Sequence, residues 1–82
     1  MINYASNQKV EIDIHNMTHA QAKRYIEQFL NKVDGSVKEV SIIHGYSGGT
    51  VLLNMVQKGL HHPKIKAKMK SLNLGVTVLI LQ

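Results

Sequence analysis

The chain of 82 residues is long enough for one small domain, and its hydrophobic content of 44% with 18% charged residues is typical of a folded globular protein rather than a disordered one. It contains no cysteine, which excludes disulfides, thiolate metal sites and thiol nucleophiles. The formal net charge of +5 favours polyanionic partners such as nucleic acid, the ribosome or an anionic membrane surface.

No stretch of the sequence resembles a membrane span or a secretory signal. No apolar run approaches the roughly 20 residues that a spanning helix needs, and the start of the chain lacks a basic segment followed by an apolar one. We therefore expect a soluble cytoplasmic protein with no membrane partner. It would consist of an N-terminal tail over residues 1–9 and one domain over residues 10–82.

Alternation and capping signals predict a strand and a helix in the first half of the chain. Residues 10–15 alternate apolar and polar side chains, which is typical of a strand with one buried face. Thr18 then has the position of a helix N-cap, and Gln21 completes a capping box with it. An apolar stripe at helical spacing continues to Val33, and Gly35 suits a left-handed position at the helix end.

The middle of the chain predicts a second strand, a loop and a second helix. Residues 37–44 have the apolar centre of a strand, and a glycine-rich loop follows over residues 45–49. Apolar side chains at helical spacing then predict a helix from Thr50 to about Leu60, which Pro63 prevents from continuing.

Two short strands are expected to complete the domain. Residues 64–70 alternate lysine with apolar or small side chains, and residues 76–81 are rich in β-branched and aliphatic ones. A turn containing Asn73 and Gly75 separates them. The order β-α-β-α-β-β predicts an α/β fold, a two-layer sandwich with a parallel core, a hairpin at one side and both helices on one face.

Two histidines are predicted to meet at one edge of this sheet. His15 ends the first strand and His44 ends the second, and ligands bind outside the carboxyl ends of parallel strands in open α/β sheets. Asp13 shares the strand face of His15, so the carboxylate and the imidazole would orient one another for acid–base chemistry. The same two side chains are also explained as the polar face of an amphipathic strand.

The segment from His44 to Thr50 joins a strand to a helix through several glycines. Glycines allow a sharp turn and a close approach to a ligand, and the following helix start offers N–H groups that suit a phosphate. An ordinary tight turn explains the glycines equally well, and their spacing fits neither a Walker loop nor a dinucleotide fingerprint. The binding residues expected here are Gly45, Tyr46, Ser47, Gly48, Gly49 and Thr50, with Tyr46 available to stack on a base.

A row of lysines marks the strand that follows the second helix. Lys64, Lys66, Lys68 and Lys70 would project from one side of it as a basic ribbon that binds phosphates. Lysine also protects exposed sheet edges from aggregation. The sequence does not decide between the two roles, and both can hold.

Taken together, these motifs resemble a known family. Residues 12–15, Ile-Asp-Ile-His, are similar to the Leu-Asp-x-His motif that opens Smr (small MutS-related) domains, and residues 44–49 are similar to the family's His-Gly-x-Gly-x-Gly motif. His62-Pro63 and residues 75–78 also fit the family pattern, so the resemblance covers about residues 11–81. It implies a fold akin to the C-terminal domain of a bacterial translation initiation factor.

The resemblance also implies binding to DNA or RNA and, in several relatives, endonuclease activity, while other relatives act on ribosomes. By this resemblance Asp13 and His15 would orient a water or a sugar hydroxyl, and His44 would act as acid or base or hold the phosphate. Water or a 2′-hydroxyl would attack, because no nucleophilic side chain is evident. No resident metal is predicted, although cleavage of DNA would call on Mg²⁺ held by Asp13.

The leading hypothesis is therefore a nucleic-acid-binding domain with endonuclease activity. A non-catalytic module that binds RNA or the ribosome would carry the same motifs and the same charge. A protein-interaction domain that pairs through its sheet edge is a third interpretation. The sequence does not distinguish DNA from RNA and does not give the oligomeric state.

Overall fold

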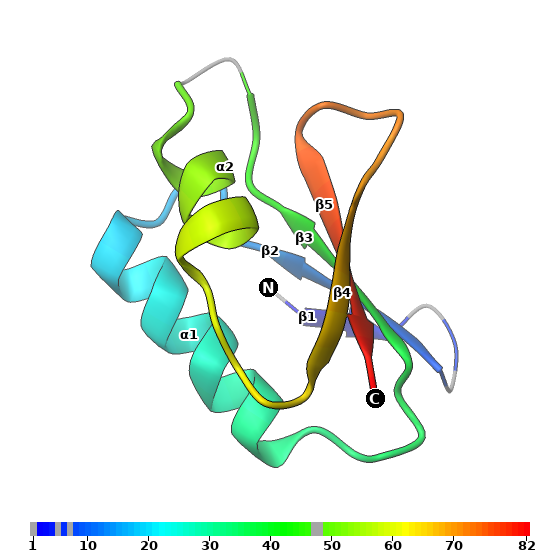
Figure 1. Ribbon diagram of the computed structural model, residues 1–82. Coiled ribbons are helices and arrows are strands. Elements are labelled where there is room, and N and C mark those ends of the chain that lie inside the picture. Colours follow the sequence, from blue (N-terminus) through cyan, green and yellow to red (C-terminus); the bar gives the residue numbers. More distant parts are fainter. Residues whose placement is uncertain (1, 5, 7, 47–48) are drawn as a thin grey trace.

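The computed structural model describes residues 2–4, 6, 8–46 and 49–82, and it consists of one five-stranded sheet with the helices against one of its faces (Figure 1). The strand order is β1-β2-β3-β5-β4; β2 and β3 run parallel, and the other neighbouring strands run antiparallel. This arrangement confirms the predicted two-layer α/β fold. In chain order the elements are β1 (Ile2–Tyr4), β2 (Lys9–Asp13), α1 (His19–Lys32), β3 (Glu39–Ile43), α2 (Val51–Asn54), a π-helical turn η1 (Met55–Gly59), β4 (Ile65–Lys70) and β5 (Val76–Leu81).

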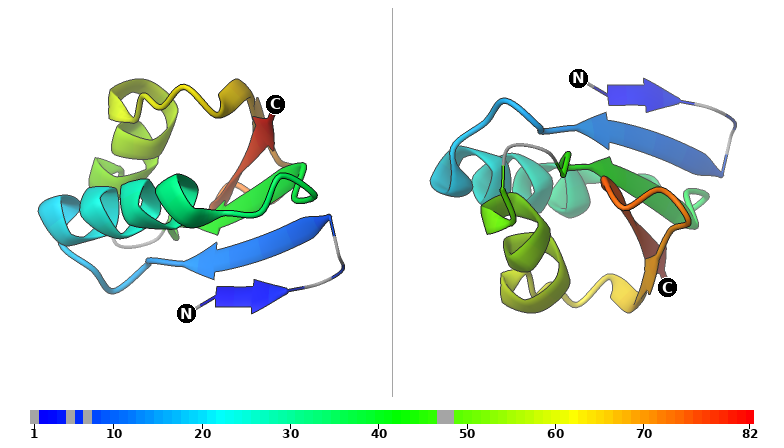
Figure 2. Two further views of the ribbon diagram at one scale, coloured as in Figure 1. Left: turned by 90° about the horizontal axis from the view of Figure 1, so that it is seen from below. Right: turned by 90° about the horizontal axis from the view of Figure 1, so that it is seen from above.

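The first strand is not expected from the sequence. β1 pairs antiparallel with β2 at one edge of the sheet, with Ile2 opposite Ile12 (Figure 2). Three residues are too few to show a periodic pattern, which is why the sequence analysis places residues 1–9 in a tail. Ile2 packs against the hydrophobic core. Pairing with a distant segment therefore makes these residues a strand.

The first helix begins as predicted and ends differently. Thr18 Oγ1 accepts a hydrogen bond from the Gln21 N–H at 3.2 Å, and the Gln21 side chain accepts one from the Thr18 N–H at 3.1 Å, which confirms the capping box. At the other end Val33 leaves the helix in an extended conformation. Gly35 is not left-handed, so that prediction is wrong. The Asp34 carboxylate, which accepts from the Ser36 N–H at 2.9 Å, forms the turn instead.

Buried positions alternate along the three central strands, so one face of the sheet packs against the helices and the other face is left uncovered. The cross-strand register aligns the buried residues in layers, each with one residue from β2, β3 and β5. One layer is Val10, Val40 and Leu79, and the next is Ile12, Ile42 and Thr77. The fully buried residues of α1 are Ala22, Ile26 and Leu30.

The second helix occupies the predicted residues but is irregular. α2 has four residues and passes directly into η1, whose Met55 and Val56 are buried, as is Leu60 after it. The chain then turns through Pro63 into β4 at the edge opposite β1. Within the described ranges, no helix has the length and apolar character needed to cross a membrane.

Candidate functional site

The loops that follow the two parallel strands leave the same end of the sheet (Figure 1). They enclose a hollow of about 390 Å³, which we call the histidine hollow. His15 and His44 both line it, so the two histidines lie at one cavity. Among the residues that the structure describes, no Asp or Glu lines it. Its polar lining comes from His15, Asn16, Thr18, His19, His44 and Tyr46.

An exposed carboxylate–imidazole pair stands at the end of β2. Asp13 Oδ1 accepts hydrogen bonds from the backbone N–H of His15 at 3.1 Å and from Nδ1 of the His15 ring. The two bonds, of which the side-chain one has the larger effect, hold the pKa of the Asp13 carboxyl below its ordinary value. Because a carboxylate only accepts, Nδ1 carries the proton, and Nε2 of a neutral His15 is left as a proton acceptor.

His44 is buried, with both ring nitrogens bonded inside the protein. Nδ1 lies 2.9 Å from the Gly45 carbonyl oxygen, which can only accept, so Nδ1 carries the proton. Nε2 then accepts from the hydroxyl of Thr77 at 2.9 Å, and that hydroxyl oxygen accepts from Gln57 Nε2 at 3.0 Å. This Gln57–Thr77–His44 chain positions the glycine loop. The acid–base role predicted for His44 would require one of these bonds to open.

Gly45 occupies a place that only glycine fits. Its φ is +79°, and a Cβ added there would lie 3.3 Å from the Cβ of His15. The N–H groups of His44 and Gly45 both donate to the carbonyl oxygen of Gly75, at 2.9 and 3.0 Å, which ties this loop to the β4–β5 turn. Gly49 also has a positive φ of +113°. The predicted Ser47 and Gly48 lie outside the described residues.

The starts of α1 and α2 both meet the hollow, and Val51 and Leu52 are the lining residues from α2. Thr18 and His19, the N-cap and the first residue of α1, line the hollow, and no acidic residue stands in the first turn. A helix N-terminus carries a partial positive charge that attracts anions. The start of the second helix, which the sequence predicts to meet the ligand, is thus at the hollow as well, although Thr50 makes no side-chain cap bond. His19 is one of the lining residues that the sequence does not single out.

A bulge interrupts the predicted lysine ribbon. The pairing register of β4 shifts at Lys66, and Lys64 precedes the strand. Beyond the bulge, Lys68 and Lys70 pair with positions of β5 that face the helices. The prediction that four lysines form one continuous row is therefore wrong, because a bulge changes the alternation of side chains.

The ammonium group of Lys68 is hydrogen-bonded to the backbone of its own chain. This group donates to the carbonyl oxygen of Gln57 at 3.3 Å and to that of Leu60, just beyond η1. Burial lowers the pKa of Lys68. A cation here compensates the carbonyl groups at the end of a helix. Lys66 and Lys70 are the exposed members of the predicted ribbon.

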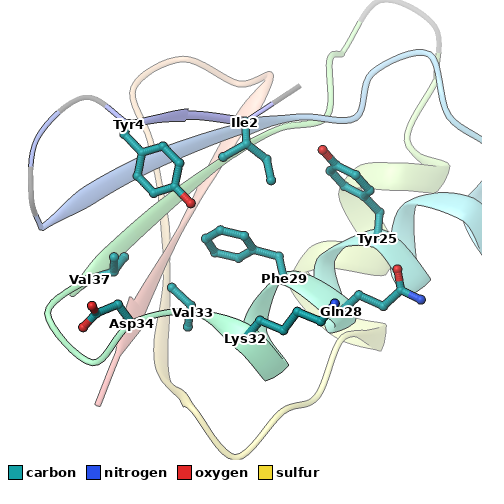
Figure 3. A pocket seen from close by; sticks show the side chains of 9 residues that line it. All are labelled: Ile2, Tyr4, Tyr25, Gln28, Phe29, Lys32, Val33, Asp34 and Val37. Atoms are coloured by element: carbon teal, nitrogen blue, oxygen red, sulfur yellow. The ribbon is translucent and has the colours of Figure 1, made fainter.

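A second hollow of about 380 Å³ lies between β1 and α1 and is more apolar (Figure 3). Tyr4 and Phe29 stand around it, with Lys32 and Asp34 also in its lining. The α1 residues in its lining run from Tyr25 to Lys32, so this hollow lies roughly 10–20 Å along α1 from the start of the helix in the histidine hollow. It contains no histidine.

Metal-binding capacity is limited in the described part of the chain. No group of three or more His, Cys, Asp or Glu side chains there lies close enough to share an ion. Mg²⁺ often takes only one or two carboxylates plus substrate phosphates. The Mg²⁺ prediction thus rests on Asp13 alone.

Comparison with known proteins identifies the family. The family model described as Smr domain matches residues 12–81. The chain belongs to the Smr domain family. The fold of this Smr domain is similar to that of the Smr domain of Thermus thermophilus MutS2, with a TM-score of 0.77 and 22% identity over 88% of this chain and 96% of that chain. No curated protein sequence matches the chain significantly.

Family membership confirms the resemblance based on the two motifs, and the Smr family is known for nucleic-acid binding. In this Smr domain the first motif supplies the exposed Asp13–His15 pair, and the second supplies the buried His44 and the left-handed Gly45. Thr77 and Gln57, which hold His44, were missed by the sequence analysis. No local signal singles out Thr77, because it is the one polar residue of an otherwise aliphatic strand and its burial follows from the register of β5.

Replacing Thr77 with valine keeps the side-chain volume but removes the hydroxyl group that bridges Gln57 and His44. We expect the free energy of unfolding to fall by about 1–3 kcal/mol, because a buried ring nitrogen loses its partner. Urea denaturation of this Smr domain measures the change. Thr77→Ser keeps the hydroxyl and should lose less; equal losses in the two variants would contradict the role of the network.

Replacing His15 with alanine should raise the pKa of Asp13 toward its ordinary value of about 3.9, because the ring hydrogen bond is lost. A carboxyl with a lowered pKa stabilises the fold above its unfolded-state pKa, and this contribution disappears as the pH falls through the folded-state value. The stability difference between native and His15→Ala proteins should therefore shrink in acid. NMR titration of the Asp13 carboxyl carbon checks the shift; His19→Ala should leave it unchanged.

Proposed function

We propose that this Smr domain binds nucleic acid, with a backbone phosphate seated in the histidine hollow. The observation that carries the proposal is the lining: two exposed histidines, His15 and His19, beside the N-terminus of α1 and with no carboxylate among the described residues around the hollow. Imidazole and backbone N–H groups are donors that suit a phosphate oxygen. The net charge of +5 adds long-range attraction for a polyanion.

The lysines at the two ends of β4 lie at different distances from the histidine hollow. Lys70 pairs with Thr77 next to the β4–β5 turn, at the end of the sheet where the histidine hollow lies. Lys64 precedes the other end of β4, about 20 Å away at the rise of an extended strand. A nucleic-acid strand bound at the histidine hollow would therefore reach Lys70 before Lys64. This placement makes Lys70 the better candidate for a phosphate contact and Lys64 a suitable control.

Cleavage of the bound strand, an endonuclease activity, is the second part of the proposal. His15, oriented by Asp13, would accept a proton at Nε2 from a water or a 2′-hydroxyl. The attacking oxygen then bonds to phosphorus while the bond to the leaving oxygen breaks. That oxygen takes a proton from a second donor, for which His19 stands in the same lining. For DNA, Asp13 would be the carboxylate available to hold Mg²⁺, and the ion would supply electrostatic stabilisation of the phosphate.

A non-catalytic module that binds RNA or the ribosome is the second candidate function. The observation that favours it is the buried state of His44, whose two ring nitrogens are bonded to the Gly45 carbonyl and to Thr77. One of the two motif histidines is thus engaged in holding the loop. Both candidates suit a cytoplasmic location, since the chain has no cysteine.

Replacing Lys70 with glutamine should weaken the binding of every oligonucleotide sequence and lower the log–log salt slope by roughly 0.7–0.9, the value for one phosphate contact. Lys64→Gln, at the far end of β4, is the matched control and should change little. Fluorescence anisotropy at several salt concentrations measures both. Equal effects of the two substitutions would contradict the proposed position of the nucleic-acid strand near Lys70. A native protein that binds no nucleic acid at low salt would refute the proposed function.

Replacing Asp13 with alanine should strongly lower the rate of cleavage while keeping affinity, because the carboxylate orients the base but is absent from the lining of the hollow. Loss of a positioned acid–base group costs about 10²–10⁴-fold in rate. Supercoiled plasmid and structured RNA, each with and without Mg²⁺, are the substrates. Asp34→Ala, at the far end of α1, is the control. Binding without any product from the native protein would favour the non-catalytic module.

A further inference from the structure

The uncovered face of the sheet has a hollow of its own, of about 520 Å³, which we call the sheet hollow. Its floor is the pair Ile43 and Val76, which are adjacent in the register of β3 and β5 and only half-buried because no helix covers this face. Tyr46 and Leu74 also line the sheet hollow, and they are 55% and 61% exposed. Asn73 adds an amide to the rim. An apolar recess with an exposed aromatic ring thus lies open to solvent.

The sheet hollow and the histidine hollow lie on opposite sides of the loop that follows β3. Gly45 and Tyr46 line both of them. The Gly75 carbonyl, which accepts from the N–H groups of His44 and Gly45, fixes this loop against the β4–β5 turn. A chain molecule that enters one hollow therefore meets the other by crossing Tyr46. Within the described residues, no acidic side chain lines either hollow.

We propose that the sheet hollow receives an unpaired nucleobase, stacked on Tyr46, while the neighbouring phosphate lies in the histidine hollow. This inference rests on the proposed function and names its substrate class. A base has two apolar faces and a polar edge, which match the aliphatic floor, the tyrosine ring and the Asn73 amide. The net charge of +5 attracts the negative charge of its backbone.

Base pairing would prevent this contact. In a duplex the bases are stacked on one another, and a protein reaches only their edges through the grooves. A base must leave the stack to present a face to Tyr46. The preferred ligand is therefore single-stranded nucleic acid, or a loop, bulge or end, rather than a regular duplex.

The chain offers matched controls for this contact. Leu72 lies on the same turn as Leu74 and is fully exposed, but it does not line the sheet hollow. Tyr4 is somewhat more exposed than Tyr46, and it lines the apolar hollow between β1 and α1 instead (Figure 3). Replacing either residue removes a similar apolar surface at a different place.

The test compares a labelled single-stranded oligonucleotide with one of equal length whose central nucleotides are abasic, so that the phosphates are kept and the bases removed. We expect native protein to bind the intact strand on the order of tenfold more tightly than the abasic one, as one stacked base contributes. Tyr46→Ala and Leu74→Ala should reduce this preference, whereas Tyr46→Phe, Tyr4→Ala and Leu72→Ala should keep it. A duplex of the same sequence should bind like the abasic strand.

Three outcomes would overturn the proposal. Equal affinity of native protein for the intact and abasic strands would remove the base site and leave nucleic-acid binding intact. No binding of either strand at low salt would refute the proposed function and this inference together. A concentration-dependent mass that Tyr46→Ala and Leu74→Ala abolish would assign the hollow to a second copy of the chain. Circular dichroism confirms that each variant is folded.

Discussion

A single carbonyl oxygen, that of Gly75, accepts hydrogen bonds from two consecutive N–H groups, those of His44 and Gly45, and the geometry of both hollows depends on this junction. It joins the end of β3 to the turn before β5, so two loops that are distant in the chain are held together. Gly45 is in the left-handed region, and His15 packs against the place where its Cβ would be. The site is thus assembled on backbone contacts that tolerate little change.

The buried chain from Gln57 through Thr77 to His44 supports the same junction from the helix side. In the described residues, no buried side-chain nitrogen or oxygen lacks a partner. A fully satisfied buried network favours one arrangement, whereas a broken one is costly, because water cannot replace the missing bond. The two motif histidines therefore have different roles. His44 holds the loop from inside, and His15 stays exposed for contact with a ligand.

Two layers leave one face of the sheet without a covering, and this constraint shapes the surface of the domain. Alternation predicts that Val10 and Ile12 of β2 enter the core, which the structure confirms, whereas in β3 and β5 the register decides which aliphatic residues are buried. The residues between them, such as Ile43 and Val76, remain half-buried, so the uncovered face is partly apolar. Sequence pattern therefore predicts most of the fold. The exceptions are β1, the π-helical turn, the end of α1 and the bulge at Lys66.

The sequence by itself determined the features that depend on neighbours a few residues away: the strand alternation, the Thr18–Gln21 capping box, the family motifs and the placement of His15 and His44 at one edge. Only the tertiary structure decided which histidine is exposed and which is locked. That difference rests on Thr77, which is 33 residues from His44 in the chain. Local propensities do not specify such contacts, because burial and strand register are set by packing between distant segments.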